Sequence, residues 1–198
     1  MKINSTTDEE YAEYLIKSQL KGWKNKLDVQ RPYRNNLKKY NLGKTLDIGC
    51  GVGRNLSVLA EGSLGIDHNA FMIKYLKTKG LNALTTQEFK KGKIHKKRFD
   101  SILIAHVIEH LANGESKKFI REYSKYLKKG GRILIICPQS KGFSKDSTHR
   151  VYQDFDSISK LIESTGFKVI SRQSFPFPVF MGGSFGPNEF WVLGKKIS

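Results

Sequence analysis

The stretch TLDIGCGVGRN, residues 45–55, decides the fold of this chain. A short β-forming run leads into three glycines spaced two residues apart, Gly49, Gly51 and Gly53, and predicts a strand, a tight turn and the start of a helix. Glycine admits positive φ and lets a ligand lie directly against backbone N–H groups, and a helix start offers further unpaired N–H groups. The stretch therefore predicts a site for a nucleotide-like cofactor.

The spacing of the glycines excludes two common cofactor motifs. The dinucleotide fingerprint G-x-G-x-x-G, counted from Gly49, requires its third glycine at the position of Arg54. A Walker-type phosphate loop ends in Gly-Lys followed by Ser or Thr, and no such sequence follows here. The spacing argues against NAD, FAD and an ATP site of that type.

A second signature follows at the spacing of a β-α-β unit. LGIDHN, residues 64–69, reads as a short strand ending in Asp67, which lies 20 residues after Asp47. A carboxylate at this place can accept hydrogen bonds from both hydroxyls of a ribose. The alternative is that Asp67 caps the next helix.

The glycine stretch closely resembles the D-x-G-x-G-x-G motif of class I S-adenosylmethionine-dependent methyltransferases, and the resemblance extends over roughly residues 44–196. It implies S-adenosyl-L-methionine as the cofactor, with its methionine end at the loop and its ribose at Asp67. Gln87 is the implied adenine contact, although family members often carry Asp or Asn there. The residues expected at the cofactor are Asp47, Gly49, Cys50, Gly51, Gly53, Asn55, Asp67, His68, Gln87, Ala105 and His106.

Strand-like and helical segments alternate through the rest of the chain. We expect strands over residues 45–49, 63–67, 82–85, 99–105, 132–137, 167–172 and 189–194, and helices over 8–21, 32–40, 53–60, 70–79, 115–127 and 157–164. Only a proline- and glycine-rich loop joins the last two strands, so they should pair antiparallel, as in the methyltransferase fold. The sequence predicts a doubly wound α/β fold, Rossmann-like, with a mostly parallel seven-stranded sheet and an antiparallel last strand. We expect one domain over 1–198, with a helical cap (1–43) and a core (44–198).

Composition limits the location and the partners. No run approaches the roughly 20 apolar residues of a membrane helix, and the first residues lack the apolar core of a secretory signal, so a cytoplasmic protein is expected. Cys50 and Cys137 lack metal-site spacing and are expected to be reduced. The net charge of +17 is compatible with nucleic-acid binding, but 27 of the 35 cationic residues are spread lysines, which favours a solvated surface.

The segment AHVIEHL, residues 105–111, should follow the fourth strand, at the edge where open parallel sheets bind ligands. It resembles the E-H-L signature of the small-molecule branch of the family (methyltransferase types 11 and 23), which includes ubiquinone-biosynthesis O-methyltransferases. It differs from the N-P-P-Y motif of amino-group methyltransferases. The resemblance therefore implies a small-molecule acceptor, methylated at oxygen in preference to nitrogen.

Histidine titrates near neutral pH and can take a proton from a hydroxyl, so His106 and His149 are the expected catalytic residues, as base or to orient the acceptor. The alternative is that these histidines only order loops through hydrogen bonds. The residues expected to contact the acceptor are Tyr14, Tyr33, His110, His149 and Arg150.

The same histidines raise the question of a metal. His106, Glu109, His110 and His149 occupy positions similar to those of divalent-metal ligands in plant small-RNA 2′-O-methyltransferases. Because many family members carry E-H-L without an ion, the sequence favours a site with no metal, and a chelator should leave activity unchanged. Two alternatives stay open: an RNA 2′-O-methyltransferase, with or without metal assistance, and a non-catalytic protein that binds S-adenosylmethionine.

Overall fold

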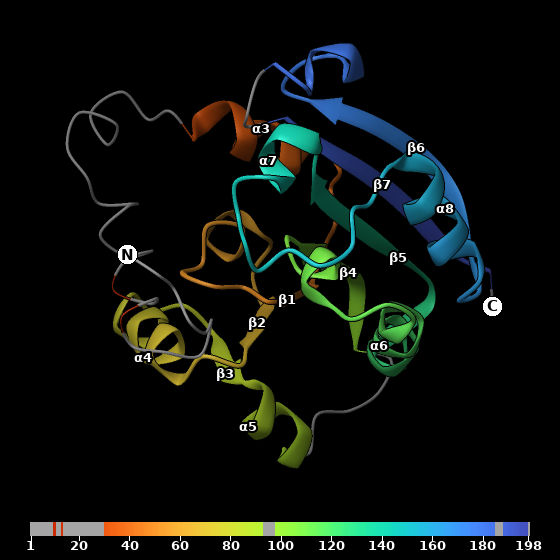
Figure 1. The fold of residues 1–198 in the computed structure, drawn as a ribbon. Helices are drawn as coiled ribbons and strands as arrows, with labels where there is room; N and C mark the ends of the chain where they lie inside the picture. The colour runs from red at the N-terminus through yellow and green to blue at the C-terminus, as the bar shows by residue number, and fades with distance from the viewer. Residues whose placement is uncertain (1–9, 11–12, 14–29, 93–97, 185–187, 198) are drawn as a thin grey trace. The chain divides into compact units, whose positions relative to one another are not determined.

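The computed structural model describes residues 10, 13, 30–92, 98–184 and 188–197. The chain divides into two compact units, residues 1–94 and 95–198, whose elements are labelled in Figure 1. The helix expected over 8–21 falls outside the described residues except for Glu10 and Glu13, and it stays a prediction. The expected single domain also stays a prediction, since the chain separates into these two compact units.

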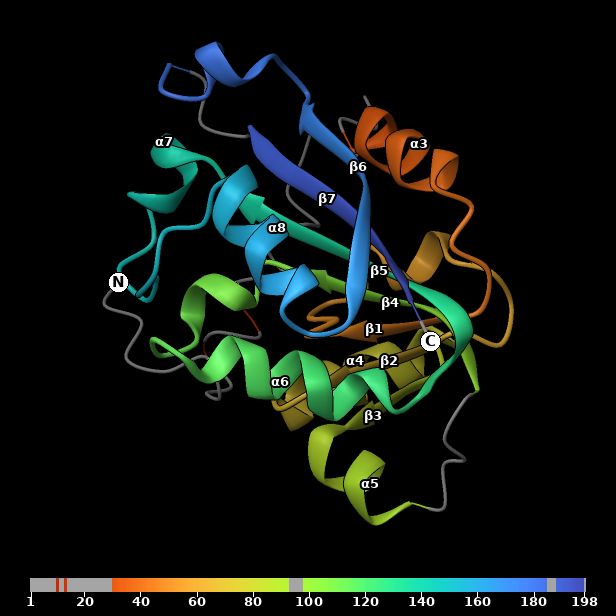
Figure 2. The same ribbon diagram turned by 90° about the vertical axis from the view of Figure 1, so that its right-hand side faces the viewer.

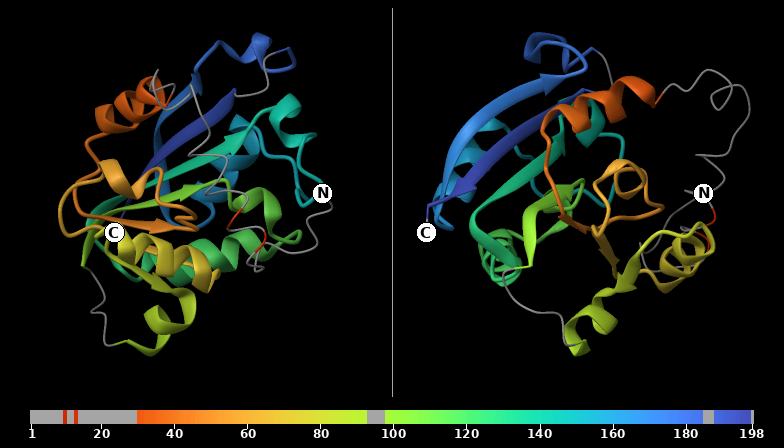
Figure 3. Two further views of the ribbon diagram at one scale, coloured as in Figure 1. Left: turned by 90° about the vertical axis from the view of Figure 1, so that its left-hand side faces the viewer. Right: turned by 180° about the vertical axis from the view of Figure 1, so that it is seen from behind.

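The first unit is built on three parallel strands among its described residues. β1 (Thr45–Ile48), β2 (Leu64–Asp67) and β3 (Ala83–Thr85) lie in the order β3-β2-β1. Two helices, α4 (Ala70–Thr78) and α5 (Thr86–Lys91), contact β2 and β3, as the right-hand view of Figure 3 shows. α3 (Arg31–Lys39) precedes β1, with a proline in its first turn. Each end of these three strands and of α3 lies within one residue of the predicted end.

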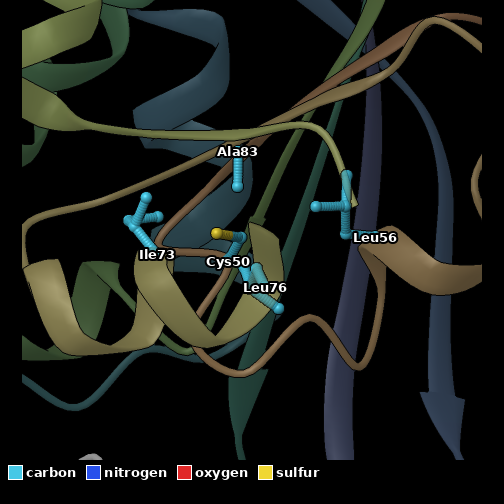
Figure 4. Packing of buried hydrophobic residues seen from close by; sticks show 5 residues of the cluster. All are labelled: Cys50, Leu56, Ile73, Leu76 and Ala83. Atoms are coloured by element: carbon cyan, nitrogen blue, oxygen red, sulfur yellow. The ribbon is translucent and has the colours of Figure 1, made fainter. Parts of the chain in front are cut away.

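The core of the first unit lies under the glycine loop. Figure 4 shows Cys50, Leu56, Ile73, Leu76 and Ala83 converging from the loop, from α4 and from β3. Cys50 therefore packs as a buried apolar side chain, and burial raises the pKa of its thiol far above the usual range. Its side chain lies in the core, so any contact with the cofactor falls to its backbone.

One helix prediction for the first unit was wrong, and one helix was missed. The α-helix expected over 53–60 is a single 3-10 turn, η1 (Leu56–Val58), because positive φ at Gly53 and extended backbone at Leu59 leave too few residues to repay the cost of nucleating a helix. α5 was not expected. It begins with a capping box, in which the Thr85 hydroxyl and the Glu88 carboxylate each accept from the other residue's backbone N–H.

The second unit carries four strands among its described residues. β4 (Phe99–Ala105), β5 (Leu127–Pro138), β6 (Phe167–Phe175) and β7 (Glu189–Lys196) lie in the order β4-β5-β7-β6. β4 and β5 are parallel, whereas β7 is antiparallel to both of its neighbours, so the prediction for the last strand is confirmed. Residues 102–105 of β4 and 133–138 of β5 are all buried, as expected of strands covered on both faces.

The helices of the second unit include α6 (Glu115–Ser124) and α8 (Phe155–Glu163), which contact each other, and α8 lies along β6 and β7 in Figure 2. The short helices η2 (Ile108–His110), α7 (Ser140–Phe143) and η3 (Val179–Met181) occupy loops. The helix predicted over 115–127 ends three residues early. Gly130 and Gly131 do not end a helix, because they lie within β5, where the register against β4 shifts.

No helix of the described part of the chain is long and apolar enough to cross a membrane.

Candidate functional site

The glycine loop of the first unit is an open backbone cradle. Gly49, Gly51 and Gly53 all have positive φ, of 71°, 52° and 81°. A Cβ built on Gly51 meets nothing within 4 Å, whereas one on Gly53 would lie 2.6 Å from Leu76 Cδ2. Gly51 therefore leaves space beside the backbone, while Gly53 allows close packing of the loop on α4.

Asp67, at the end of β2, is fastened to this loop. The Gly51 N–H donates to Asp67 Oδ2 at 2.9 Å, and the Asn69 N–H donates to Oδ1 at 2.9 Å. The cap of α4 is Asn69, whose side chain accepts from Phe71 and Met72, so the alternative role of Asp67 as the helix cap is not what the structure shows. Each carboxylate oxygen can accept a second hydrogen bond, which leaves acceptor capacity for ribose hydroxyls.

Asp47, in β1, is a buried carboxylate. Its side chain is 1% exposed, and neither oxygen has a hydrogen-bond partner among the described residues. Burial, with the nearby Asp67 carboxylate, raises the pKa of Asp47 to about 7. A cationic group at this loop would offset both the desolvation of the Asp47 carboxylate and its repulsion by the Asp67 carboxylate. The loop and its two acids therefore fit an S-adenosylmethionine, whose methionine end carries an ammonium and a sulfonium.

The other residues predicted in the first unit differ in accessibility. Asn55 is buried, and its side-chain oxygen has no hydrogen-bond partner in the described structure. His68 is exposed, with Nδ1 3.4 Å from Asp67 Oδ1, and Gln87 is exposed on α5. Tyr33 is buried beneath the Arg54 guanidinium, which lies 4.1 Å from its ring centroid. Tyr14 lies outside the described residues.

In the second unit, His106 follows β4 with a positive φ of 58°, next to the buried last residue of that strand, Ala105. Its Nε2 lies 2.8 Å from Glu189 Oε1, and its Nδ1 lies 3.4 Å from Glu109 Oε1. Burial lowers the pKa of the imidazole, but the Glu109 and Glu189 carboxylates outweigh it and raise the pKa to about 9. A protonated imidazole has no lone pair, so this geometry favours orientation over the role of a base.

Glu189 is the contact that the sequence analysis missed. It is the first residue of β7, and its Oε2 accepts from Trp191 Nε1 at 2.9 Å while Oε1 binds His106. It lies 83 residues from His106, so no local spacing joins the pair. The only signal was an acid at the start of a strongly apolar strand.

Glu109, His110 and His149 form a second cluster in the same unit. Their nearest ligand-type atoms all lie within 4.8 Å of one another, so these three residues could hold a metal ion. Burial lowers the pKa of His110, which favours its neutral form. The Arg150 backbone N–H donates to the Glu109 carbonyl at 2.7 Å, whereas the Arg150 side chain is exposed. The structure thus brings together the predicted residues His106, His110 and His149 around Glu109.

Comparison with known proteins gives a matching domain and a matching fold. Residues 46–135 match the model of a methyltransferase domain. A structure of an S-adenosylmethionine-dependent methyltransferase from Archaeoglobus fulgidus superposes with a TM-score of 0.67 over 96% of this chain and 100% of the other, at 22% identity. Residues 46–135 are therefore similar to a methyltransferase domain, and the likeness to the solved structure is one of fold. The described strands form the seven-stranded, mostly parallel sheet with an antiparallel last strand that the sequence predicts.

Two further similar proteins are methyltransferases with different names. The 1,6-didemethyltoxoflavin-N1-methyltransferase of Burkholderia thailandensis, solved with S-adenosylhomocysteine, has a TM-score of 0.62 at 18% identity, over 100% of this chain and 94% of its own. Phosphoethanolamine N-methyltransferase 3 of Arabidopsis thaliana is 28% identical over 64% of this chain. The chain spans only 29% of that relative's length. S-adenosylmethionine is the cofactor of the family whose model matches residues 46–135.

Proposed function

We propose that this chain transfers a methyl group from S-adenosylmethionine to a small molecule. The observation that carries the proposal is the bond from Gly51 N–H to Asp67, beside the unpartnered carboxylate of Asp47. Here the backbone donors and acids expected of the cofactor site lie together, within a domain that matches the methyltransferase family.

The chain's own residues would bind and orient the two reactants. Asp47 would face the cationic methionine end of the cofactor, and Asp67 its ribose. The bound cofactor supplies an electrophilic methyl on a sulfonium. Because methyl transfer is an in-line displacement, most of the acceleration would come from positioning the acceptor in line with that methyl.

The acceptor class is proposed as a small molecule with a reacting oxygen. An alcohol or phenol must lose a proton during transfer, and this part of the site holds an imidazole able to assist. The His149 Nδ1 donates to the Phe143 carbonyl at 2.8 Å, which leaves Nε2 with a lone pair. Some relatives, such as phosphoethanolamine N-methyltransferase, are named as enzymes that methylate nitrogen. Amines therefore belong in any acceptor screen.

Calorimetry with S-adenosylmethionine and S-adenosylhomocysteine tests the cofactor half of the proposal. We expect both to bind the wild-type chain. Asp67→Asn should weaken binding at least about tenfold, since hydrogen bonds to a charged group contribute about 1.5–3 kcal/mol. Glu61→Gln, at an exposed acid of the same unit, is the matched control and should bind like wild type. No heat with either ligand would overturn the proposal.

Transfer of a labelled methyl group to an acceptor library tests the other half. The library should include phenols, alcohols, carboxylates, amines and a folded RNA. Incorporation into an oxygen acceptor is expected. Binding without transfer to any acceptor would instead support a non-catalytic protein.

A further inference from the structure

Glu109 is a fully buried carboxylate whose partners among the described residues are incomplete. Its side chain is 0% exposed, and neither oxygen has a hydrogen-bond partner among the described residues. The nearest cationic candidates are His106 Nδ1 at 3.4 Å and His149 Nε2 at 4.0 Å. An ionised carboxylate buried in this way requires a cation close by. His106 supplies only part of that charge, because its other nitrogen binds Glu189.

Two imidazoles next to Glu109 have their proton positions fixed by hydrogen bonds. His149 Nδ1 lies 2.8 Å from the Phe143 carbonyl, which can only accept, so the proton sits on Nδ1. His110 Nδ1 lies 3.3 Å from the Thr148 carbonyl and 3.1 Å from the Thr148 hydroxyl, whose own proton goes to Asp146. His110 therefore also carries its proton on Nδ1. Both Nε2 atoms are left with a lone pair.

These supporting contacts are those of ligand histidines. A metal-binding imidazole donates its other N–H to a carbonyl or carboxylate, which fixes both its tautomer and its orientation. The rings of His110 and His149 lie 4.7 Å apart, and Phe143 stacks on His149 at 5.0 Å. The backbone N–H groups of Arg150 and Val151 donate to the Glu109 carbonyl at 2.7 and 3.2 Å, which ties η2 to the loop that carries His149.

We propose that Glu109 and the Nε2 atoms of His110 and His149 form a binding site for a divalent transition-metal ion, of the class of Mn²⁺, Co²⁺ or Zn²⁺. Each of the three residues has a ligand-type atom within 4.8 Å of those of the other two, so each atom would need to shift by about 1 Å to surround an ion that binds at about 2.0–2.2 Å. Two imidazoles select against Mg²⁺ and Ca²⁺, which prefer oxygen ligands. This proposal departs from the sequence expectation of a site without metal. The sequence could not show that the Glu109 carboxylate is buried or which nitrogen of each histidine carries the proton.

The proposed ligand set excludes His106, because both of its nitrogens face carboxylates. Three protein ligands leave open positions, as in catalytic rather than structural sites. When bound, the ion would take up the His149 Nε2 lone pair and supply a Lewis acid for an acceptor oxygen, so that the metal, in place of His149, would promote loss of the acceptor's proton. That catalytic part rests on the proposed function, whereas binding of the ion does not.

The test is titration of the chelator-treated, dialysed full-length chain with Zn²⁺, Mn²⁺, Mg²⁺ and Ca²⁺, without S-adenosylmethionine. We expect one site for Zn²⁺ and Mn²⁺, with Mg²⁺ and Ca²⁺ at least about 100-fold weaker. Glu109→Gln and His149→Asn should each weaken Zn²⁺ binding more than about 100-fold, because each removes a direct ligand. Glu163→Gln, at an exposed acid of α8, is the matched control and should bind like wild type.

Circular dichroism of each variant separates lost ligands from lost folding. Glu109→Gln keeps the side-chain shape but loses the ion pair with His106, so it should melt somewhat lower than wild type in the metal-free state, while a native spectrum and a cooperative melt show that it folds. Substitution by Co²⁺ gives a second readout, since its visible absorption should appear in wild type and be absent from a folded Glu109→Gln. Absence of a single Zn²⁺ or Mn²⁺ site in wild type, or equal binding by folded Glu109→Gln, would overturn the proposal. Because cofactor binding is measured separately, failure of the proposed function would not produce either result.

Discussion

Asp47 makes the stability of the cofactor-free chain depend on pH. Its pKa is about 7 in the folded chain, against an ordinary value of 3.8, so the native state holds a proton that the unfolded chain has released between those values. A raised carboxyl pKa means that stability falls as pH rises through this window. The full effect is about 4 kcal/mol, at 1.36 kcal/mol per pKa unit.

Denaturant unfolding of wild type and Asp47→Asn, at about pH 4 and about pH 8, isolates this contribution. The asparagine has no charge to bury, so it should gain several kcal/mol on wild type at the higher pH and much less at the lower one. An advantage that is the same at both values would contradict the burial of an ionisable Asp47.

The same residue predicts the pH dependence of cofactor binding. A cationic methionine end favours ionised Asp47, so the affinity for S-adenosylhomocysteine should fall as pH drops below about 7, the pKa of the free chain. Calorimetry from about pH 5.5 to 8.5 should show this fall in wild type and a flatter profile in Asp47→Asn. An equally steep profile in the variant would assign the dependence to another group.

Sequence reasoning at the scale of residues works best where spacing is local. That Gly51 and Asp67 lie together could be predicted because each lies at or just after the end of one of two neighbouring parallel strands, whereas their role as cofactor contacts stays a prediction. Glu189 could not, because its partner His106 is reached only through the pairing of β7 with β5. The charge state of His106 depends on the same long-range contact, so it was also beyond reach.

At the scale of elements, the glycine loop separates backbone freedom from packing. In Gly53→Ala the new methyl would lie 2.6 Å from Leu76 Cδ2 at a φ of 81°, and the sum of strain and overpacking should cost about 2–4 kcal/mol. In Gly80→Ala the φ is 71° but nothing lies within 4 Å, so only strain of about 1 kcal/mol is expected. Equal losses of unfolding free energy would contradict the packing role of Gly53.

Gly51→Ala should show the opposite balance. Its Cβ meets no protein atom, so stability should fall by only about 1 kcal/mol from strain at positive φ. The methyl would project into the open space beside the loop, and binding of S-adenosylhomocysteine should drop more than about tenfold. If Gly51→Ala folds and binds with wild-type affinity, the cofactor does not lie against the Gly51 backbone.

The elements that the sequence misjudged share one cause. Apolar periodicity located the long strands and α4, α6 and α8, because these bury a continuous face. The short elements η1 and α5 depend on caps and φ values instead. The T-x-x-E pattern from Thr85 to Glu88 could have predicted α5. By contrast, no residue pattern in 53–60 predicts the extended backbone at Leu59 that ends the helix after one turn.

At the scale of the whole molecule, the net charge of +17 raises the question whether the acceptor is a small molecule or an RNA. Retention on RNA at different salt concentrations distinguishes the two. Exposed lysine pairs lie on both units, at Lys38-Lys39 of α3 and Lys117-Lys118 of α6. A lysine-rich solvated surface attracts RNA without specificity, through counterion release that salt reverses. We therefore expect weak retention on immobilised RNA that disappears between about 0.05 and 0.2 M salt.

Charge reversal distinguishes a diffuse surface from an RNA-binding face. If the charge is diffuse, converting Lys38-Lys39 or Lys117-Lys118 to glutamates should reduce RNA retention by the same amount, because each exposed pair removes equal charge. Neither variant should change methyl transfer to a small acceptor, because both pairs are exposed and neither belongs to the predicted cofactor or acceptor contacts. A loss confined to one pair, together with labelled methyl entering RNA, would instead identify a binding face and favour the RNA 2′-O-methyltransferase.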